Sequence, residues 1–263
     1  MERPNGIGIK YMVAEIHLPE YVTRLDCHDT FTFACHAEVN CFTECCRMLE
    51  LALTPYDVLR LRKATGLNSQ QLLEEYIIIE QDPGEPFPRF YLTMVNDGRA
   101  SCVFIAPQGC TVYQHRPSAC RAYPLGRAAI RTDGGAITEH FVMMKENHCC
   151  GFLEAAQQTP IQYCIDQELT AYNRFNDAVI QLLQHDAIRN GLIPSQKHID
   201  FFILALYNLD TFRKVLFEDK FESIILSRQE KNRLLDDEEL LLFAIDVLHR
   251  QLFAIFQDSG LPL

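Results

Sequence analysis

CHAEVNCFTECC at residues 35–46 and CVFIAPQGCTVYQHRPSAC at residues 102–120 are the two stretches around which the chain is organised. Together they supply seven of the eleven cysteines, namely Cys35, Cys41, Cys45, Cys46, Cys102, Cys110 and Cys120. A late pair, Cys149-Cys150, follows them. Thiolate sulfur is a soft ligand that selects zinc, copper(I) and iron–sulfur clusters over hard cations. We therefore expect these thiols to hold zinc or iron.

The spacing leaves the number of metal centres open. Cys41, Cys45 and Cys46 are close enough in sequence to meet at one centre. Adjacent residues rarely point both side chains at one tetrahedral ion, so Cys45 and Cys46 either serve different centres or one of them only packs. Two four-thiolate centres and one cluster with several structural cysteines are equally compatible with the count.

Composition excludes some classes of function. The chain has 263 residues, 24 basic against 35 acidic, and a formal net charge of −11, whereas nucleic-acid binders usually have a basic excess. No run approaches the roughly 20 apolar residues of a membrane span, and the N-terminus lacks the apolar region of a signal peptide. We expect a cytoplasmic protein, in which free cysteines are more common than disulfides.

Between the two cysteine stretches the sequence predicts two helices. Thr54 is a good N-cap for a helix over Pro55–Thr65, which Gly66 ends. Ser69 is expected to cap a second helix that carries Leu72, Leu73, Tyr76 and Ile77 on one side, and the Pro-rich segment 82–88 must break it.

Short strands are expected near the second cysteine stretch. The pattern predicts them within Phe90–Ile105 around an Asn96-Asp97-Gly98 turn, at Thr111–Tyr113, in a hairpin with arms 128–131 and 136–141, and at Ile7–Val13. Pro117 is expected to open one helical turn that presents Cys120.

Beyond residue 160 the sequence predicts helix alone. Apolar residues recur at three- and four-residue steps from Ile161 to near Gly191, from Ser195 to Leu216, and from Asp236 to Gln257. The expected fold is mainly α with a small irregular β component (α+β). We expect a cysteine-bearing region, 1–158, packed as one unit against a helical region, 159–263, whose apolar faces form core or bind a protein partner.

Three segments resemble a known family. They are Phe33-x-Cys35 through Cys45-Cys46, then Leu53-Thr54-Pro55-Tyr56-Asp57, and then Cys110-Thr-Val-Tyr113-x-x-Arg116-Pro117-x-x-Cys120-Arg121-x-Tyr123-Pro124. Over about residues 33–151 the chain resembles the CxxCxxCC-type, or YkgJ-like, cysteine-cluster family. That family is described as a zinc- or iron-chelating domain and is related to the flagellin lysine N-methylases.

The resemblance implies a set of eight ligands: Cys35, Cys41, Cys45, Cys46, Cys102, Cys110, Cys120 and Cys149. The chain departs from the family at Cys35, because the common spacing is two residues and here it is five and then three. Cys27, Cys150, His36, His115 and His148 stay open as further ligands. Cys164 falls beside the apolar stripe of its helix, so we expect a core cysteine.

Four other residues are expected beside the metal. Four thiolates around zinc(II) leave a net charge of −2, which guanidinium groups of Arg116 and Arg121 can offset. The alternative is that both arginines form ordinary surface ion pairs. Tyr113 and Tyr123 are expected either to line a pocket near the metal or to frame the ligand loop.

These observations support two functions. The first is an iron–sulfur protein, with a [4Fe–4S] cluster, for redox chemistry or for modification of a protein side chain such as lysine N-methylation. The second is a non-enzymatic interaction module that zinc stabilises. The sequence has no phosphate loop, no GxGxxG and no GxSxG, and it identifies no catalytic residue.

Overall fold

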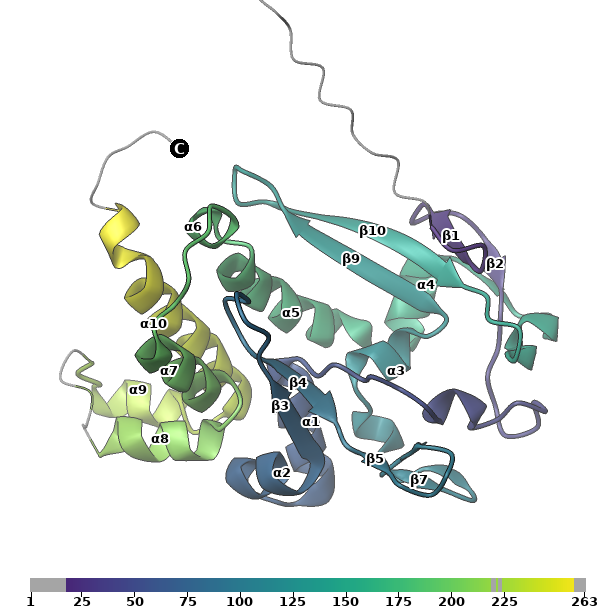
Figure 1. Cartoon of the computed structure of the whole chain (residues 1–263), viewed down its shortest axis with the longest axis horizontal. Helices are drawn as coiled ribbons and strands as arrows, with labels where there is room; N and C mark the ends of the chain where they lie inside the picture. The colour runs from purple at the N-terminus through teal and green to yellow at the C-terminus, as the bar shows by residue number, and fades with distance from the viewer. Residues whose placement is uncertain (1–17, 219–220, 222–223, 258–263) are drawn as a thin grey trace, which may run out of the picture.

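The computed structural model describes residues 18–218, 221 and 224–257 of the chain (Figure 1). Its helices are α1 (Pro55–Thr65), α2 (Ser69–Tyr76), α3 (Ser118–Ala122), α4 (Pro160–Asp166), α5 (Leu169–Leu183), α6 (Asp186–Arg189), α7 (Gln196–Leu206), α8 (Leu209–Phe217), α9 (Arg228–Arg233) and α10 (Asp237–Gln257). Its strands are β1 (Val22–Leu25), β2 (Phe31–Thr32), β3 (Ile77–Glu80), β4 (Arg89–Leu92), β5 (Met94–Val95), β6 (Ser101–Cys102), β7 (Ile105–Ala106), β8 (Gly109–Cys110), β9 (Leu125–Arg131), β10 (Ile137–Met144) and β11 (Gln157–Gln158). The predicted class, mainly α with a small β component, is confirmed. The strand expected at Ile7–Val13 lies outside the described residues.

All strand pairs are antiparallel, and most are very short. The largest sheet has the order β1-β10-β9, and the predicted hairpin between β9 and β10 is confirmed, with Ile137 opposite Arg131. The other sheets have two strands each, β11-β2, β3-β4, β5-β6 and β7-β8. Two-stranded sheets of this size are marginal by themselves, so they depend on what packs against them.

Helix α1 begins and ends where its local signals predict. The Thr54 side chain accepts a hydrogen bond from the backbone of Asp57, and the Asp57 carboxylate accepts one from the backbone of Thr54. Gly66 adopts φ 71°, a left-handed conformation that glycine reaches without strain, and its N–H donates to the Arg62 carbonyl.

Helix α2 corrects two expectations. Its N-cap is Asn68, which forms a capping box with Gln71, and Ser69 is instead buried as the first helical residue. Ile77 does not extend the helix, because it begins β3 and pairs with Leu92. Near the second cysteine stretch, the strand expected at Thr111–Tyr113 is wrong: β8 ends at Cys110, and Tyr113–His115 forms a 3-10 turn.

Two long helices predicted in the second half are each interrupted. The first divides into α4, α5 and α6, with Glu168 in the left-handed region at φ 54° between α4 and α5. The second divides into α7 and α8 at Tyr207-Asn208. The third is confirmed as α10, and the Asp236 carboxylate accepts hydrogen bonds from the backbone N–H groups of Glu238 and Glu239.

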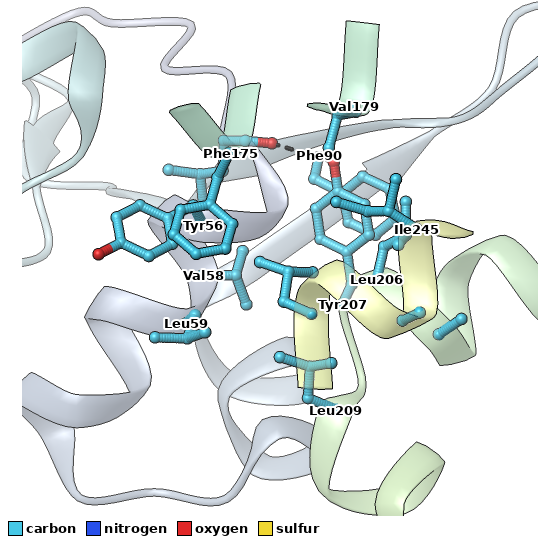
Figure 2. Packing of buried hydrophobic residues seen from close by; sticks show 14 of the residues in the cluster. Tyr56, Val58, Leu59, Phe90, Phe175, Val179, Leu206, Tyr207, Leu209 and Ile245 are labelled. Carbon is cyan, nitrogen blue, oxygen red and sulfur yellow. Dashed lines mark hydrogen bonds between the residues drawn. The ribbon is translucent and has the colours of Figure 1, made fainter. Parts of the chain in front are cut away.

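One hydrophobic core joins the first half of the chain to the C-terminal helices (Figure 2). Tyr56 of α1 stacks on Phe175 of α5 with ring centroids 4.2 Å apart, and Phe90 of β4 stacks on Tyr207. Each such pair contributes about 0.5–1.5 kcal/mol beyond the area that it buries. The C-terminal helices, α5 among them, therefore supply much of the apolar environment of α1.

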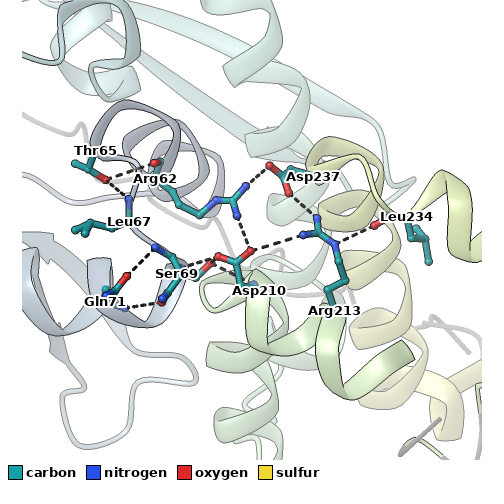
Figure 3. Close-up of polar contacts among 10 residues, drawn as sticks. Arg62, Thr65, Leu67, Ser69, Gln71, Asp210, Arg213, Leu234 and Asp237 are labelled. Atoms are coloured by element: carbon teal, nitrogen blue, oxygen red, sulfur yellow. Dashed lines mark hydrogen bonds and ion pairs between the residues drawn. The ribbon is translucent and has the colours of Figure 1, made fainter. Parts of the chain in front are cut away.

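Ion pairs connect the same elements at the edge of that core (Figure 3). Arg62 of α1 donates to Asp210 of α8 at 2.6 Å and also to Asp237 of α10. Arg213 donates to Asp237 at 2.5 Å, and the Ser69 backbone donates to Asp210 at 2.8 Å. Partly buried pairs that share partners in this way fix α1, α8 and α10 in one arrangement.

Candidate metal centre

Four thiols from two segments that lie far apart in the sequence line one small pocket. They belong to Cys35, Cys41, Cys45 and Cys149. The pocket is completed by Phe33, Tyr123, His148 and Gly151. We call these four cysteines the first thiol group.

A close approach of two backbones brings Cys149 to this pocket. Ala34 donates a backbone hydrogen bond to the Gly151 carbonyl at 3.0 Å, beside the pairing of β2 with β11. A Cβ atom at Gly151 would lie 2.6 Å from the Ala34 oxygen and 2.5 Å from the Phe33 ring. Only glycine fits there without a shift of the chain. In the same loop the Cys150 N–H donates to Cys41 Sγ at 3.0 Å.

A second thiol group forms at the short hairpins. Cys102 ends β6 and Cys110 ends β8, and both pack against the edge of the main core together with Cys120 of α3. An antiparallel bridge joins Arg47 to Ser101. Continued by one residue, this antiparallel register would pair the positions of Cys46 and Cys102. The second thiol group is Cys46, Cys102, Cys110 and Cys120.

Asp57 fixes the helical turn that presents Cys120. As predicted, α3 opens directly after Pro117. The Ser118 N–H donates to Asp57 Oδ1 at 2.7 Å, and the Ser118 hydroxyl donates to Oδ2 at 3.1 Å. Asp57 is fully buried, so the residue that completes the cap of α1 also anchors α3.

The thiols lie near enough to one another to affect their protonation. Cys35 is exposed as a residue, but partial burial of its thiol raises the pKa to about 11, and the thiols of Cys45, Cys41 and Cys149 add to the effect. Burial likewise raises the pKa of Cys120, with contributions from Cys102, Asp57, Cys110 and Cys45. A hydrogen bond with Cys46 is the main reason why the pKa of Cys45 is raised. The two groups are thus neighbours that meet at Cys45 and Cys46.

Comparison with known proteins identifies the segment that carries both groups. Residues 34–151 match the family model of the CxxCxxCC domain, described as a putative zinc- or iron-chelating domain. The chain contains a CxxCxxCC domain. No curated protein and no solved structure matches the chain. The predicted family is therefore confirmed.

The CxxCxxCC domain has a donor set suited to zinc or iron. Its sulfur atoms are soft ligands, and none of the eleven cysteines forms a disulfide in the described chain. Within residues 18–218, 221 and 224–257, no three His, Cys, Asp or Glu side chains converge on a point where they could hold an ion. The ligand assignment thus depends on which thiols are neighbours, and metal binding requires the thiol side chains to rotate inward.

The tyrosines of the domain differ in position. Tyr123 lines the pocket, and its buried hydroxyl has no hydrogen-bond partner among the described residues. Burial and the adjacent Cys149 thiol raise the pKa of Tyr123. Tyr113 is half exposed and lies outside the pocket lining, with the Arg116 guanidinium 3.9 Å from its ring centroid. Tyr123 is therefore the tyrosine that a metal-bound thiolate at Cys149 would contact.

The two arginines also have different surroundings. Arg116 is the cation whose charge opposes the raised pKa values of both Cys35 and Cys110. Arg121 is buried, and its guanidinium donates to the carbonyls of Gln114, Arg116 and Gln167. It also pairs with Glu168 at 3.2 Å. Arg121 thus joins α3 to the start of α5, while the Arg116 guanidinium donates to the Tyr113 carbonyl and to Gln167 Oε1.

The open candidates are also placed. His148 lines the pocket, whereas His36 pairs with Glu154 at 3.5 Å. Burial, and then Arg60, lowers the pKa of His115. Cys164 packs against the main core, as expected.

Three residues that position the site were not identified from the sequence. Gly151 directly follows Cys149-Cys150 in the sequence, Asp57 entered only as part of the segment Leu53-Thr54-Pro55-Tyr56-Asp57, and the Cys150 N–H carries no side-chain signal. Their roles depend on long-range backbone contacts. The one sequence signal for these roles is that Gly151 directly follows a cysteine pair.

Proposed function

We propose that this chain is an iron–sulfur protein whose CxxCxxCC domain binds iron through clustered thiolates, for redox chemistry or for modification of a protein side chain. The observation that carries the proposal is the first thiol group, in which the 35–46 stretch and the distant Cys149 loop bring four thiols to one pocket. The neighbouring second group supports it, because eight thiols exceed what one structural zinc requires. When bound, an iron–sulfur cluster supplies one-electron chemistry at a potential that its surroundings set.

Groups on this chain are available to tune such a centre. The Cys150 N–H already donates to Cys41 Sγ, and the Arg116 cation lies close to both thiol groups. Hydrogen bonds to sulfur and a nearby positive charge stabilise the thiolate form. They also favour the more negative, reduced state of a cluster, which raises its potential.

A protein side chain is a plausible substrate class on grounds of access and charge. Cys35 is exposed at the rim of the pocket, so the first thiol group opens to solvent. The formal net charge of −11 attracts a substrate that carries lysine. Lysine N-methylation would transfer a methyl group from a small-molecule methyl donor to a neutral lysine Nζ, which then releases a proton.

The proposed compartment is the reducing cytoplasm. All eleven cysteines are free thiols in the structure, and thiols persist where glutathione and thioredoxin keep them reduced. No helix in the described part of the chain is long and apolar enough to cross a membrane.

Metal and sulfide analysis of the full-length protein, purified without oxygen, tests the iron–sulfur proposal. We expect iron and acid-labile sulfide in equal amounts and a brown protein with a broad visible absorption. The Cys41→Ser and Cys110→Ser variants should lose metal, while Cys164→Ser should retain it. Colourless protein with stoichiometric zinc and no sulfide would contradict the proposal.

One observation favours a second candidate, a zinc-stabilised interaction module. Strands β5 to β8, which carry Cys102 and Cys110, have only two residues each. Such strands need an additional constraint, and structural zinc supplies folding free energy directly. In that case chelation should melt the domain, and circular dichroism should show the loss. Unchanged helicity and melting temperature after complete metal removal would exclude this alternative.

A further inference from the structure

The adjacent side chains of Cys45 and Cys46 point in different directions. Both residues belong to a 3-10 helical turn, Glu44–Cys46. A 3-10 helix has three residues per turn, so adjacent side chains point about 120° apart. Two neighbouring cysteines in this conformation do not reach the same tetrahedral ion without distortion of the backbone.

The two thiols of the Cys45-Cys46 tandem are hydrogen-bonded to each other, and the other residues around them differ. Cys45 lines the pocket together with Cys35, Cys41 and Cys149. Cys46 lies next to Arg47, whose bridge to Ser101 sets an antiparallel register that, continued by one residue, would pair Cys46 with Cys102. The Met48 N–H donates to the Ala100 carbonyl at 2.9 Å, which continues the same register.

The two groups also rest on different apolar cores. Cys149 packs against a small cluster formed by Phe31, Phe33, Leu125 and Tyr163. Cys102, Cys110 and Cys120 pack against the main core that includes α1 and α5. Because the second group packs against the main core, loss of its metal would destabilise the whole fold. The first group includes the exposed Cys35, so its metal would exchange with solvent more readily.

We propose that the domain holds two separate metal centres of four thiolates each, Cys35, Cys41, Cys45 and Cys149 in one and Cys46, Cys102, Cys110 and Cys120 in the other. The boundary between the centres runs through the Cys45–Cys46 peptide. This inference rests on the proposed function, since it requires that the thiols bind metal, but it holds for zinc as well as for iron.

Charge balance is consistent with two neighbouring centres. Each centre with zinc(II) and four thiolates would have a net charge of −2. The Arg116 cation acts on Cys35 of one group and on Cys110 of the other. Beside Cys46, the Arg47 Nε atom is buried and has no hydrogen-bond partner among the described residues. This guanidinium nitrogen, on the residue next to Cys46, is therefore a donor available to the second group.

A map of thiol protection in the full-length chain tests the proposal. The protein is loaded with Co²⁺ without oxygen, its cobalt is counted, and a thiol-alkylating reagent followed by mass spectrometry reports each cysteine. We expect about two cobalt ions per chain, with thiolate-to-cobalt absorption typical of tetrahedral sites and all eight cysteines protected.

Single variants separate the two centres. Cys41→Ser should lose about half of the cobalt and expose only Cys35, Cys45 and Cys149 to the reagent. Cys110→Ser should lose the other half and expose only Cys46, Cys102 and Cys120. Cys164→Ser is the matched control and should keep both ions. In the Cys41→Ser and Cys110→Ser variants, continued protection of Cys164 from alkylation shows that the fold persists. If Cys41→Ser unfolds, Cys149→Ser replaces it as the test of the first group.

The outcomes are distinguishable. Loss of all cobalt from either variant, or joint exposure of Cys45 and Cys46 by a change in one group, overturns the two-centre assignment but leaves the proposed function intact. Wild-type protein that binds no metal overturns both.

Discussion

Gly151→Ala tests whether the approach of two backbones positions the first thiol group. The added Cβ would lie 2.5 Å from Phe33 Cε2 and 2.6 Å from the Ala34 oxygen. Comfortable contacts between such atoms are about 3.3–4.0 Å, so the strands must separate by about 1 Å. Because one of the opposing atoms belongs to the backbone, side-chain rotation alone cannot relieve the clash.

The expected cost follows from overpacking. Inserting a methyl group into a filled site costs about 1–3 kcal/mol. Replacement of glycine by alanine returns about 0.4–1 kcal/mol by restricting the unfolded chain. The net loss, between about 0 and 2.6 kcal/mol and centred on about 1.3 kcal/mol, should appear in urea denaturation as a lower midpoint with an unchanged slope. Because the shift moves Cys149 away from Cys41, metal bound by the first group should fall as well.

Gly134→Ala is the matched control. Its added Cβ would meet only Thr132 Oγ1, at 4.0 Å, and its φ is not in the left-handed region. The change in stability should be within about 0.5 kcal/mol. If Gly151→Ala is as stable and binds as much metal as Gly134→Ala, the contact with Ala34 does not position Cys149.

Three further predictions concern the support of the site. Asp57→Ala leaves the buried N–H groups of Thr54 and Ser118 without an acceptor, so it should lower the free energy of unfolding in urea by about 2–5 kcal/mol. Asp57→Asn keeps one acceptor oxygen and should lower it less. Equal losses in the two variants would show that the acceptors are unimportant. Phe175→Ala removes a ring that is 1% exposed and should cost about 3–5 kcal/mol by the same measurement, and a cost below about 1 kcal/mol would contradict the core assignment. Burial alone would raise the pKa of Asp210, but hydrogen bonds from Ser69 and the Arg62 guanidinium prevail and lower the pKa below 3.8. This carboxylate therefore stabilises the fold above pH 4, and the stabilisation is lost as the pH falls further. The melting temperature of Asp210→Asn should depend less on pH between 5 and 3 than that of the wild type, and parallel curves would refute the assignment.

Local signals were sufficient where an element is fixed by its own residues. Thr54, Pro55 and Gly66 predict α1 because capping and the left-handed turn involve only neighbouring backbone. Pro117 and the Asp133-Gly134-Gly135 turn succeed for the same reason.

Local signals failed where the apolar period continues across a break. Ile165 and Leu169 keep the helical spacing, yet Glu168 between them takes a left-handed conformation and separates α4 from α5. Ile77 continues the apolar face of α2, but pairing with Leu92 places it in a strand. In both cases tertiary contacts outweigh a local preference.

The family resemblance selects eight candidate cysteines, and their membership of a metal site stays a prediction. How these cysteines lie relative to one another depends on the bridge of Arg47 with Ser101 and on the approach of Gly151 to Ala34. Neither contact has a sequence signal, because both are made by backbone atoms of residues that lie far apart in the chain.

The stacking of Tyr56 on Phe175 limits how this domain could move between proteins. The family match ends at residue 151, but the rings and leucines that cover α1 come from α5, α7, α8 and α10. A gene fusion that transferred residues 34–151 alone would carry the ligands without the apolar surface that holds α1. A transplant that preserves the thiol arrangement must bring those helices along or find a host whose own surface replaces them.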